Sequence, residues 1–181
     1  RVAHWGIART SSLTYSIGYR APGVADILGN FADDVAASIP ERLRYTDPEI
    51  NSQIHPAAIP HNVISRLRQL LVDNLLDDVR ISDWFGRYMT EPKYPDLQPM
   101  PESWPLPAKG ILAASPDARF AFTDTMLFAN GRSYARCSGD QWIYELIDKR
   151  RINIKTVTTA GKPSLQLLQR LVDDGALCCD D

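Results

Sequence analysis

The chain has 181 residues, of which 44% are hydrophobic and 23% are charged, and its formal net charge is -2. This composition is that of an ordinary globular protein, and the near-neutral charge argues against broad electrostatic attraction to nucleic acid or to an anionic membrane. No apolar run approaches the roughly 20 residues that span a bilayer, and we expect no signal peptide. The three cysteines, Cys137, Cys178 and Cys179, do not form a disulfide framework, which favours a cytoplasmic protein that binds no membrane.

The first element is a predicted strand at residues 13–22, LTYSIGYRAP, in which Leu, Thr, Tyr and Ile are followed by Gly18 and Pro22. A lone strand is not stable in water, and the sequence begins without Met. We therefore expect this strand to close a β domain whose earlier strands precede Arg1. His4 then lies at the lip of that domain.

Three helices are predicted after Pro22. Apolar residues recur at helical spacing over residues 24–35, and again from His61 to residue 76, with Asn62 as a possible N-cap. The third helix carries Trp84 and is expected to be capped by Ser82 or a neighbour. The second helix has a broad apolar stripe, which consists of Val63, Ile64, Leu67, Leu70, Leu71, Leu75 and Leu76.

Wide apolar faces on these helices predict a region that buries surface between two subunits, and hence a homodimer. Residues 41–60 form a long irregular connection between the first two helices. The pairs at 33–34 and 77–78 (Asp33, Asp34, Asp77, Asp78) are interpreted as solvated helix faces, because adjacent helical residues point about 100° apart.

Residues 91–107 contain six prolines and predict a semi-rigid linker. Beyond it, residues 111–114 and 119–123 predict two paired strands around a turn at Pro116. A second pair is predicted at 126–129 and 133–137, around the hairpin signal Asn130-Gly131. A helix capped by Ser138 or Asp140, a Leu-rich helix over residues 163–175 and a short strand at 176–179 complete a winged-helix-like pattern.

Several motifs occur in a shared order with one enzyme family. They are the segment from His4 through Tyr15-Ser16-Ile17-Gly18-Tyr19-Arg20-Ala21-Pro22, then Phe31-Ala32-Asp33-Asp34, Tyr45-Thr46-Asp47-Pro48-Glu49, His55-Pro56, Trp84-Phe85-Gly86, Ala129-Asn130-Gly131 and the Leu-rich helix that ends at Gly175. In this order and spacing the chain resembles the C-terminal half of the bacterial ribosomal oxygenases, which are JmjC-type cupins that hydroxylate an arginine of a large-subunit ribosomal protein.

The resemblance implies an α+β architecture in four parts. Residues 1–22 would be the terminal strands of a cupin/JmjC double-stranded β-helix, 23–90 a helical dimerisation region, 91–107 the Pro-rich linker and 108–181 a winged-helix-like domain. The parent protein would be an Fe(II)- and 2-oxoglutarate-dependent dioxygenase, with a large-subunit ribosomal protein as its substrate.

The same resemblance implies a role for His4 as an iron ligand, and no catalytic residue beyond it. In the family, an H-x-D pair supplies two more ligands, and this sequence contains no H-x-D. One ligand does not hold Fe(II), so this chain alone is expected to be inactive. Read without the resemblance, His4 is an ordinary surface histidine.

Thr14, Ser16 and Arg20 lie on or just past the predicted strand, where alternate side chains face the interior of a barrel. They are candidates for binding the co-substrate carboxylate or the substrate backbone. The alternative is that they are ordinary strand residues, with Arg20 in a surface ion pair.

Two other functions remain open from the sequence. The helices and the winged-helix part could form a non-enzymatic dimerisation and protein-binding module. A DNA-binding regulator is the third hypothesis, but the basic residues at 132, 136, 149–151 and 155 are interleaved with acidic ones, and groove binding needs a concentrated positive face. We therefore expect no DNA partner.

Overall fold

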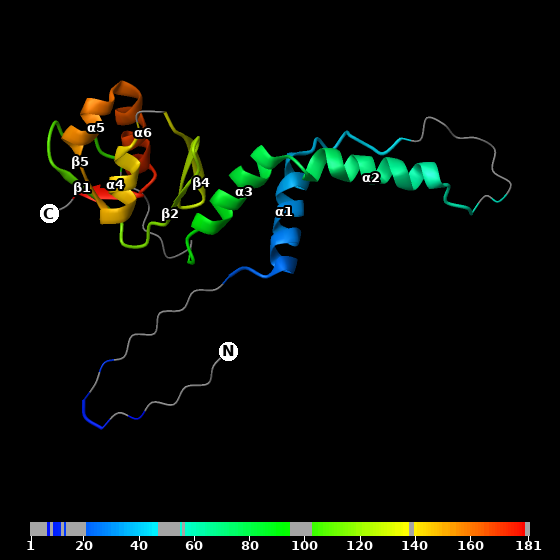
Figure 1. The fold of residues 1–181 in the computed structure, drawn as a ribbon, viewed down its shortest axis with the longest axis horizontal. Helices are drawn as coiled ribbons and strands as arrows, with labels where there is room; N and C mark the ends of the chain where they lie inside the picture. Colours follow the sequence, from blue (N-terminus) through cyan, green and yellow to red (C-terminus); the bar gives the residue numbers. More distant parts are fainter. Residues whose placement is uncertain are drawn as a thin grey trace.

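A computed structural model of the chain describes residues 7, 9–11, 13, 21–46, 55, 57–94, 103–137 and 140–179 (Figure 1). The elements, in chain order, are α1 (Val24–Ser38), α2 (His61–Leu75), α3 (Asp78–Thr90), β1 (Ile111–Ala114), β2 (Phe120–Phe122), β3 (Met126–Ala129), β4 (Arg132–Ala135), α4 (Trp142–Lys149), β5 (Arg151–Asn153), α5 (Ile154–Ala160), α6 (Lys162–Asp173) and β6 (Leu177–Cys179). The predicted strand at 13–22 falls almost entirely outside these residues. Among the described helices, none combines the length and the apolar character that crossing a membrane requires.

The first predicted helix is confirmed as α1, but its apolar stripe is only partly covered. Val35 is 3% exposed, and the ring of Phe31 packs against Trp84 of α3 with centroids 5.1 Å apart. At the other end of the same stripe, Val24 and Leu28 are 74% and 65% exposed. The packing of α1 on α3 therefore buries only the C-terminal half of the stripe.

The second and third helices are also confirmed, but both predicted caps are wrong. α2 begins at His61 after Pro60, so Asn62 lies inside the helix. α3 begins four residues before Ser82, because the carboxylate of Asp77 accepts hydrogen bonds from the N–H groups of residues 79 and 80 at 2.9 and 3.4 Å. Asp77 is thus an N-cap that satisfies free helix donors, which a solvated-face interpretation did not capture.

The strands form two antiparallel sheets of three, in the orders β5-β1-β6 and β2-β3-β4. The predicted pairing of 111–114 with 119–123 is therefore wrong, since β1 and β2 belong to different sheets. Leu112 of β1 is 1% exposed and pairs with Ile152 on one side and Cys179 on the other. These partners are distant in sequence, and a local pattern does not reveal them.

The hairpin at Asn130-Gly131 is confirmed as the connection between β3 and β4. Both residues have positive φ, 50° and 78°, as a two-residue type I′ turn requires.

Helices α4, α5 and α6 pack with β5-β1-β6 around one hydrophobic core (Figure 1). Its residues include Leu112, Leu127, Ile143, Leu146, Ile152, Val157, Leu168 and Leu171, all at most 1% exposed. The closing strand is confirmed as β6, and the Leu-rich helix as α6, which ends at Asp173, two residues before Gly175.

β5 and α5 were not predicted. They occupy residues 151–160, directly after Arg150, which adopts the left-handed conformation with φ 56° and ends α4. Asp140 lies just before α4, and Gln141 holds its N-cap position. The second predicted cap, Ser138, lies outside the described residues.

Candidate functional site

The predicted site residues cannot be placed by the structure. His4, Thr14, Ser16 and Arg20 all lie outside the described residues, so their roles stay predictions. Within the described ranges, no group of three or more His, Cys, Asp or Glu side chains could hold a metal ion. His61 lies on α2, where its Nδ1 is 3.3 Å from the hydroxyl of Ser65 one turn away.

Cys178 and Cys179 lie on β6, within the predicted strand at 176–179. The thiol of Cys178 donates to the carbonyl of Ala113 on β1 at 3.6 Å. All three cysteines are unpaired. Nothing in their geometry indicates a metal site.

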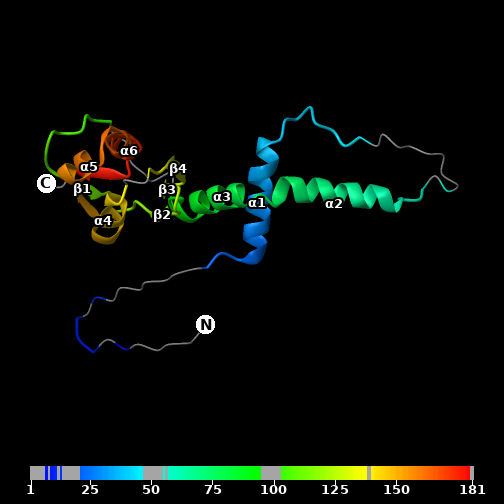
Figure 2. The ribbon, with the colours of Figure 1, turned by 45° about the horizontal axis from the view of Figure 1, so that its top comes forward.

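Helix α2 presents an uncovered apolar surface. None of its residues is buried. Four residues define what we call the α2 face, namely Ile64, Leu67, Leu70 and Leu71, and they are 39–54% exposed. Their spacing places them on one side of the helix. Figures 1 and 2 show α2 directed away from the sheets, with α1 crossing near the junction of α2 and α3.

Helix α3 is fixed to the sheet β2-β3-β4. Gly86 lies against the ring of Phe128 so closely that a Cβ atom there would be 2.4 Å from a ring carbon. At the end of the helix, the Thr90 hydroxyl accepts a hydrogen bond from Gly131 N–H at 3.1 Å and donates one to the Gly86 carbonyl at 2.9 Å. The hairpin therefore contacts the last turn of α3 directly.

An ion-pair cluster joins α1 to α3. The guanidinium of Arg87 lies 3.0 Å from the carboxylates of Asp34 and of Asp83. Partial burial alone would lower the pKa of Arg87, but the hydrogen bonds to both carboxylates outweigh it and raise that pKa. Asp34 is thus half-buried and paired, which corrects its interpretation as a solvated residue. Through α3, the helical region is connected to the sheets.

Four of the six basic residues that suggested DNA binding make side-chain contacts within the protein. Lys149 pairs with Glu145 at 2.9 Å, and Arg150 donates to the carbonyls of Ser115 and Ala118 at 2.7 and 2.9 Å. The guanidinium of Arg136 lies 5.2 and 5.1 Å from the ring centroids of Phe122 and Tyr144, and Arg132 pairs with Asp174. These contacts spread the positive charge over several surfaces, which disfavours DNA binding.

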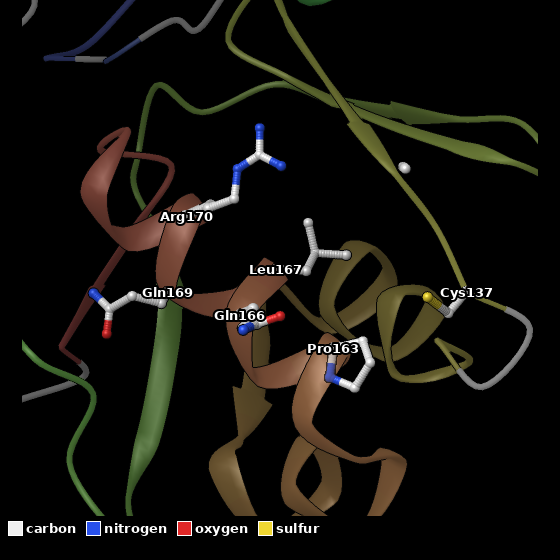
Figure 3. Close-up of a pocket in the computed structure, with 7 residues that line it drawn as sticks. Cys137, Pro163, Gln166, Leu167, Gln169 and Arg170 are labelled. Atoms are coloured by element: carbon white, nitrogen blue, oxygen red, sulfur yellow. The ribbon is translucent and has the colours of Figure 1, made fainter.

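A cleft of about 450 Å³ lies between β4 and α6, and we call it the β4–α6 cleft (Figure 3). Its walls are Ala135, Cys137, Pro163, Gln166, Leu167, Gln169 and Arg170. No local sequence pattern indicates this cleft, because its two walls come from elements some thirty residues apart.

Comparison with known proteins gives the family context. Residues 67–178 match the model of the family described as ROXA-like winged helix. This match begins inside α2 and includes α3, in agreement with the close packing of α3 on β3.

A curated relative, the ribosomal protein uL16 3-hydroxylase of Escherichia coli, is 27% identical over 91 residues, which are 50% of this chain and 24% of that protein. Among solved structures, the Escherichia coli ribosomal oxygenase YcfD matches with a TM-score of 0.72 and 20% identity, over 91% of this chain and 48% of that one. The same enzyme in complex with cobalt and 2-oxoglutarate matches with a TM-score of 0.73 and 18% identity, over the same shares. The chain thus spans about half the length of these solved structures, and the mixed helix-and-sheet fold with a winged-helix part is confirmed.

Proposed function

The chain belongs to the ROXA-like winged helix family, and from this premise we propose that it is the C-terminal part of an Fe(II)- and 2-oxoglutarate-dependent protein hydroxylase. The proposed substrate is an arginine of a large-subunit ribosomal protein. The observation that carries the proposal is the match of nearly the whole described fold to a ribosomal oxygenase. The free thiols of all three cysteines fit the reducing cytoplasm that we propose as its location.

The residues of this chain do not by themselves fit the iron. His4 is the only ligand we propose from it, and the described residues contribute no ligand cluster. A facial iron site takes two histidines and a carboxylate. The 181 residues alone are therefore expected to be inactive, and iron and 2-oxoglutarate are proposed for the whole protein. Thr14, Ser16 and Arg20 are proposed to contact the oxo-acid or the substrate backbone.

The described residues have a supporting role in this proposal. α3 lies between α1 and the sheet β2-β3-β4, and its contacts on both sides are close and polar as well as apolar. Such a connection fixes the helical region relative to the winged-helix part. A substrate that contacts both parts would then meet a surface of constant geometry.

We further propose that the α2 face is buried between two copies of the chain in a homodimer. Leu70 and Leu71 are 45% and 54% exposed, and apolar contact area of this kind is usually covered by a partner. Because α2 extends away from the rest of the chain (Figure 2), a second copy could reach the face without displacing α1 or α3.

The experiment is Fe(II)-dependent turnover of 2-oxoglutarate with an arginine peptide from a ribosomal protein. It would be measured on this chain and on the same chain extended upstream. Turnover by the extended protein, with loss of activity in His4→Ala and none in the 181-residue chain, supports the proposal. If the extended protein is inactive while the short chain still dimerises, the chain is a binding module.

A further inference from the structure

We propose that the β4–α6 cleft binds an extended acidic peptide segment of a partner protein, which adds as a strand to the free edge of β4. This site goes beyond the proposed hydroxylase activity and does not depend on it.

The first observation is that β4 is an edge strand. In the order β2-β3-β4 only one side of β4 is paired. Arg136 N–H donates to the carbonyl of Thr125 at 2.8 Å, and in an antiparallel pair alternate residues turn their main-chain groups to the partner strand. The main-chain N–H and C=O groups of Tyr134 and Arg132 therefore point to β3. Those of Ser133 and Ala135 point to the outer edge.

These outward groups are available to a ligand. No residue that the structure describes forms a hydrogen bond with the main chain of Ser133 or Ala135 on that side, and Ala135 is an exposed wall of the cleft. An edge strand with free N–H and C=O groups is a template for another strand. The pairing would end at Cys137, whose N–H already donates to the carboxylate of Asp140 at 2.7 Å.

The second observation is the position of Arg170. Its guanidinium lies 5.0 Å from the ring centroid of Tyr134, which orients it in the cleft beside Leu167 (Figure 3). The two nearby carboxylates are engaged elsewhere: Asp174 accepts from the Tyr134 hydroxyl at 2.7 Å, and Asp173 accepts from Ser103 at 2.7 Å. Across the described ranges, Arg170 has no side-chain hydrogen bond and no ion pair.

An oriented arginine with free N–H donors is a strong binding site for a carboxylate, whose two oxygens can both accept hydrogen bonds from the guanidinium. Gln166 adds an exposed amide one turn earlier on the same side of α6. The cleft thus offers main-chain pairing on one wall and carboxylate recognition on the other. This combination is that of strand-addition sites, where the edge gives affinity and side-chain pockets give specificity.

The walls favour a peptide over a nucleic acid. The apolar part of the cleft consists of Ala135, Pro163 and Leu167, with no aromatic side chain among its lining residues. Sites for single-stranded nucleic acid usually provide aromatic rings on which bases stack. Positive charge in the cleft also disfavours a basic ribosomal protein tail as the occupant.

The test is an NMR titration of the 181-residue chain with a blocked hexapeptide of alternating Glu and Thr. The matched peptide has Lys in place of Glu. Binding of the Glu peptide should shift the amide signals of Ser133 and Ala135, and the Lys peptide should bind at least tenfold more weakly.

Two variants separate the contributions. Arg170→Gln should weaken binding of the Glu peptide about tenfold, the effect of one charge-assisted hydrogen bond, whereas Lys155→Gln, with the same charge change outside the cleft, should leave it unchanged. Ala135→Pro removes an outward N–H that β3 does not use, a substitution that edge strands tolerate, and it should weaken binding by a similar factor.

The proposal is overturned if the Glu peptide causes no shifts in the cleft, if both peptides bind equally, or if Arg170→Gln has no more effect than Lys155→Gln. Competition of an unstructured RNA oligonucleotide for the same signals, at lower concentration than the peptide, would also overturn it. A circular dichroism spectrum of each variant confirms that it is folded before titration.

Discussion

Replacing Gly86 with alanine should destabilise the protein, although alanine is the better helix former. A Cβ atom at this position would lie 2.4–2.5 Å from three ring carbons of Phe128, about 1 Å or more inside ordinary carbon contact. Phe128 is 1% exposed, so its ring would have to move against other buried groups.

The two opposing contributions can be compared. Overpacking of a close-packed site costs about 1–3 kcal/mol, and alanine in place of glycine inside a helix recovers about 1 kcal/mol. Because three atoms of a buried ring are involved, the upper end of the range applies. The free energy of unfolding should therefore fall by about 2 kcal/mol.

The measurement is urea unfolding followed by circular dichroism, with Gly29→Ala as the matched control. Gly29 is also a helical glycine, but its Cβ would meet nothing within 4 Å, so this variant should be unchanged or more stable by up to about 1 kcal/mol. Gly86→Ala should also cost less in the Phe128→Leu background. If Gly86→Ala behaves like Gly29→Ala, α3 does not pack on β3 as described.

Three further predictions concern a buried carboxylate, the α2 face and a buried phenol. Asp140, 2% exposed, accepts hydrogen bonds from a main-chain N–H, from an indole and from a serine hydroxyl. In Asp140→Asn, an amide donor would face that main-chain N–H, and the free energy of unfolding measured in urea should fall by about 2 kcal/mol. Exposed Asp148→Asn should leave this free energy unchanged. Equal effects of the two substitutions would contradict the role of the Asp140 carboxylate. Leu70→Lys should convert the proposed dimer to a monomer in analytical sedimentation at micromolar concentration, and a monomeric unsubstituted chain would refute the dimer. Burial raises the pKa of Tyr134 above its usual value of 10, and the hydrogen bond to a carboxylate raises it further. The stabilising contribution of the Tyr134 phenol is therefore complete below about pH 10 and is lost as the pH rises further. Above about pH 10, the free energy of unfolding should fall less steeply with pH in Tyr134→Phe than in the unsubstituted chain. If Tyr134→Phe and Tyr144→Phe show the same dependence on pH, burial of the Tyr134 phenol is not the cause.

Elements with a strong local signal were predictable from the sequence. Asn130-Gly131 predicts its hairpin because both residues tolerate positive φ, and α6 has buried residues at helical spacing with Gly175 beyond its end. The prediction of α1 succeeded for the same reason, although it did not reveal that only half of the apolar stripe is covered.

The errors arise where distant residues decide the structure. β1 pairs with strands that follow it by about forty and sixty-five residues, so its strand character was evident but its partners were not. Asp77 and Ser82 are both plausible helix caps, and only the packing of α3 on the sheet determines the register. The β4–α6 cleft depends on the same long-range assembly. The residues of the predicted iron site, His4 and the three strand residues that follow it, lie outside the described residues, and their roles rest on the resemblance alone.

We proposed that this chain is part of an enzyme that hydroxylates an arginine in a large-subunit ribosomal protein. The most direct test is intact-protein mass spectrometry of large-subunit ribosomal proteins from source cells with and without the gene that encodes this chain. We expect that one protein gains the mass of a single oxygen atom, located on an arginine, only when the gene is present and its His4 codon is unchanged. Identical masses for every large-subunit protein in both cell lines would contradict the claim.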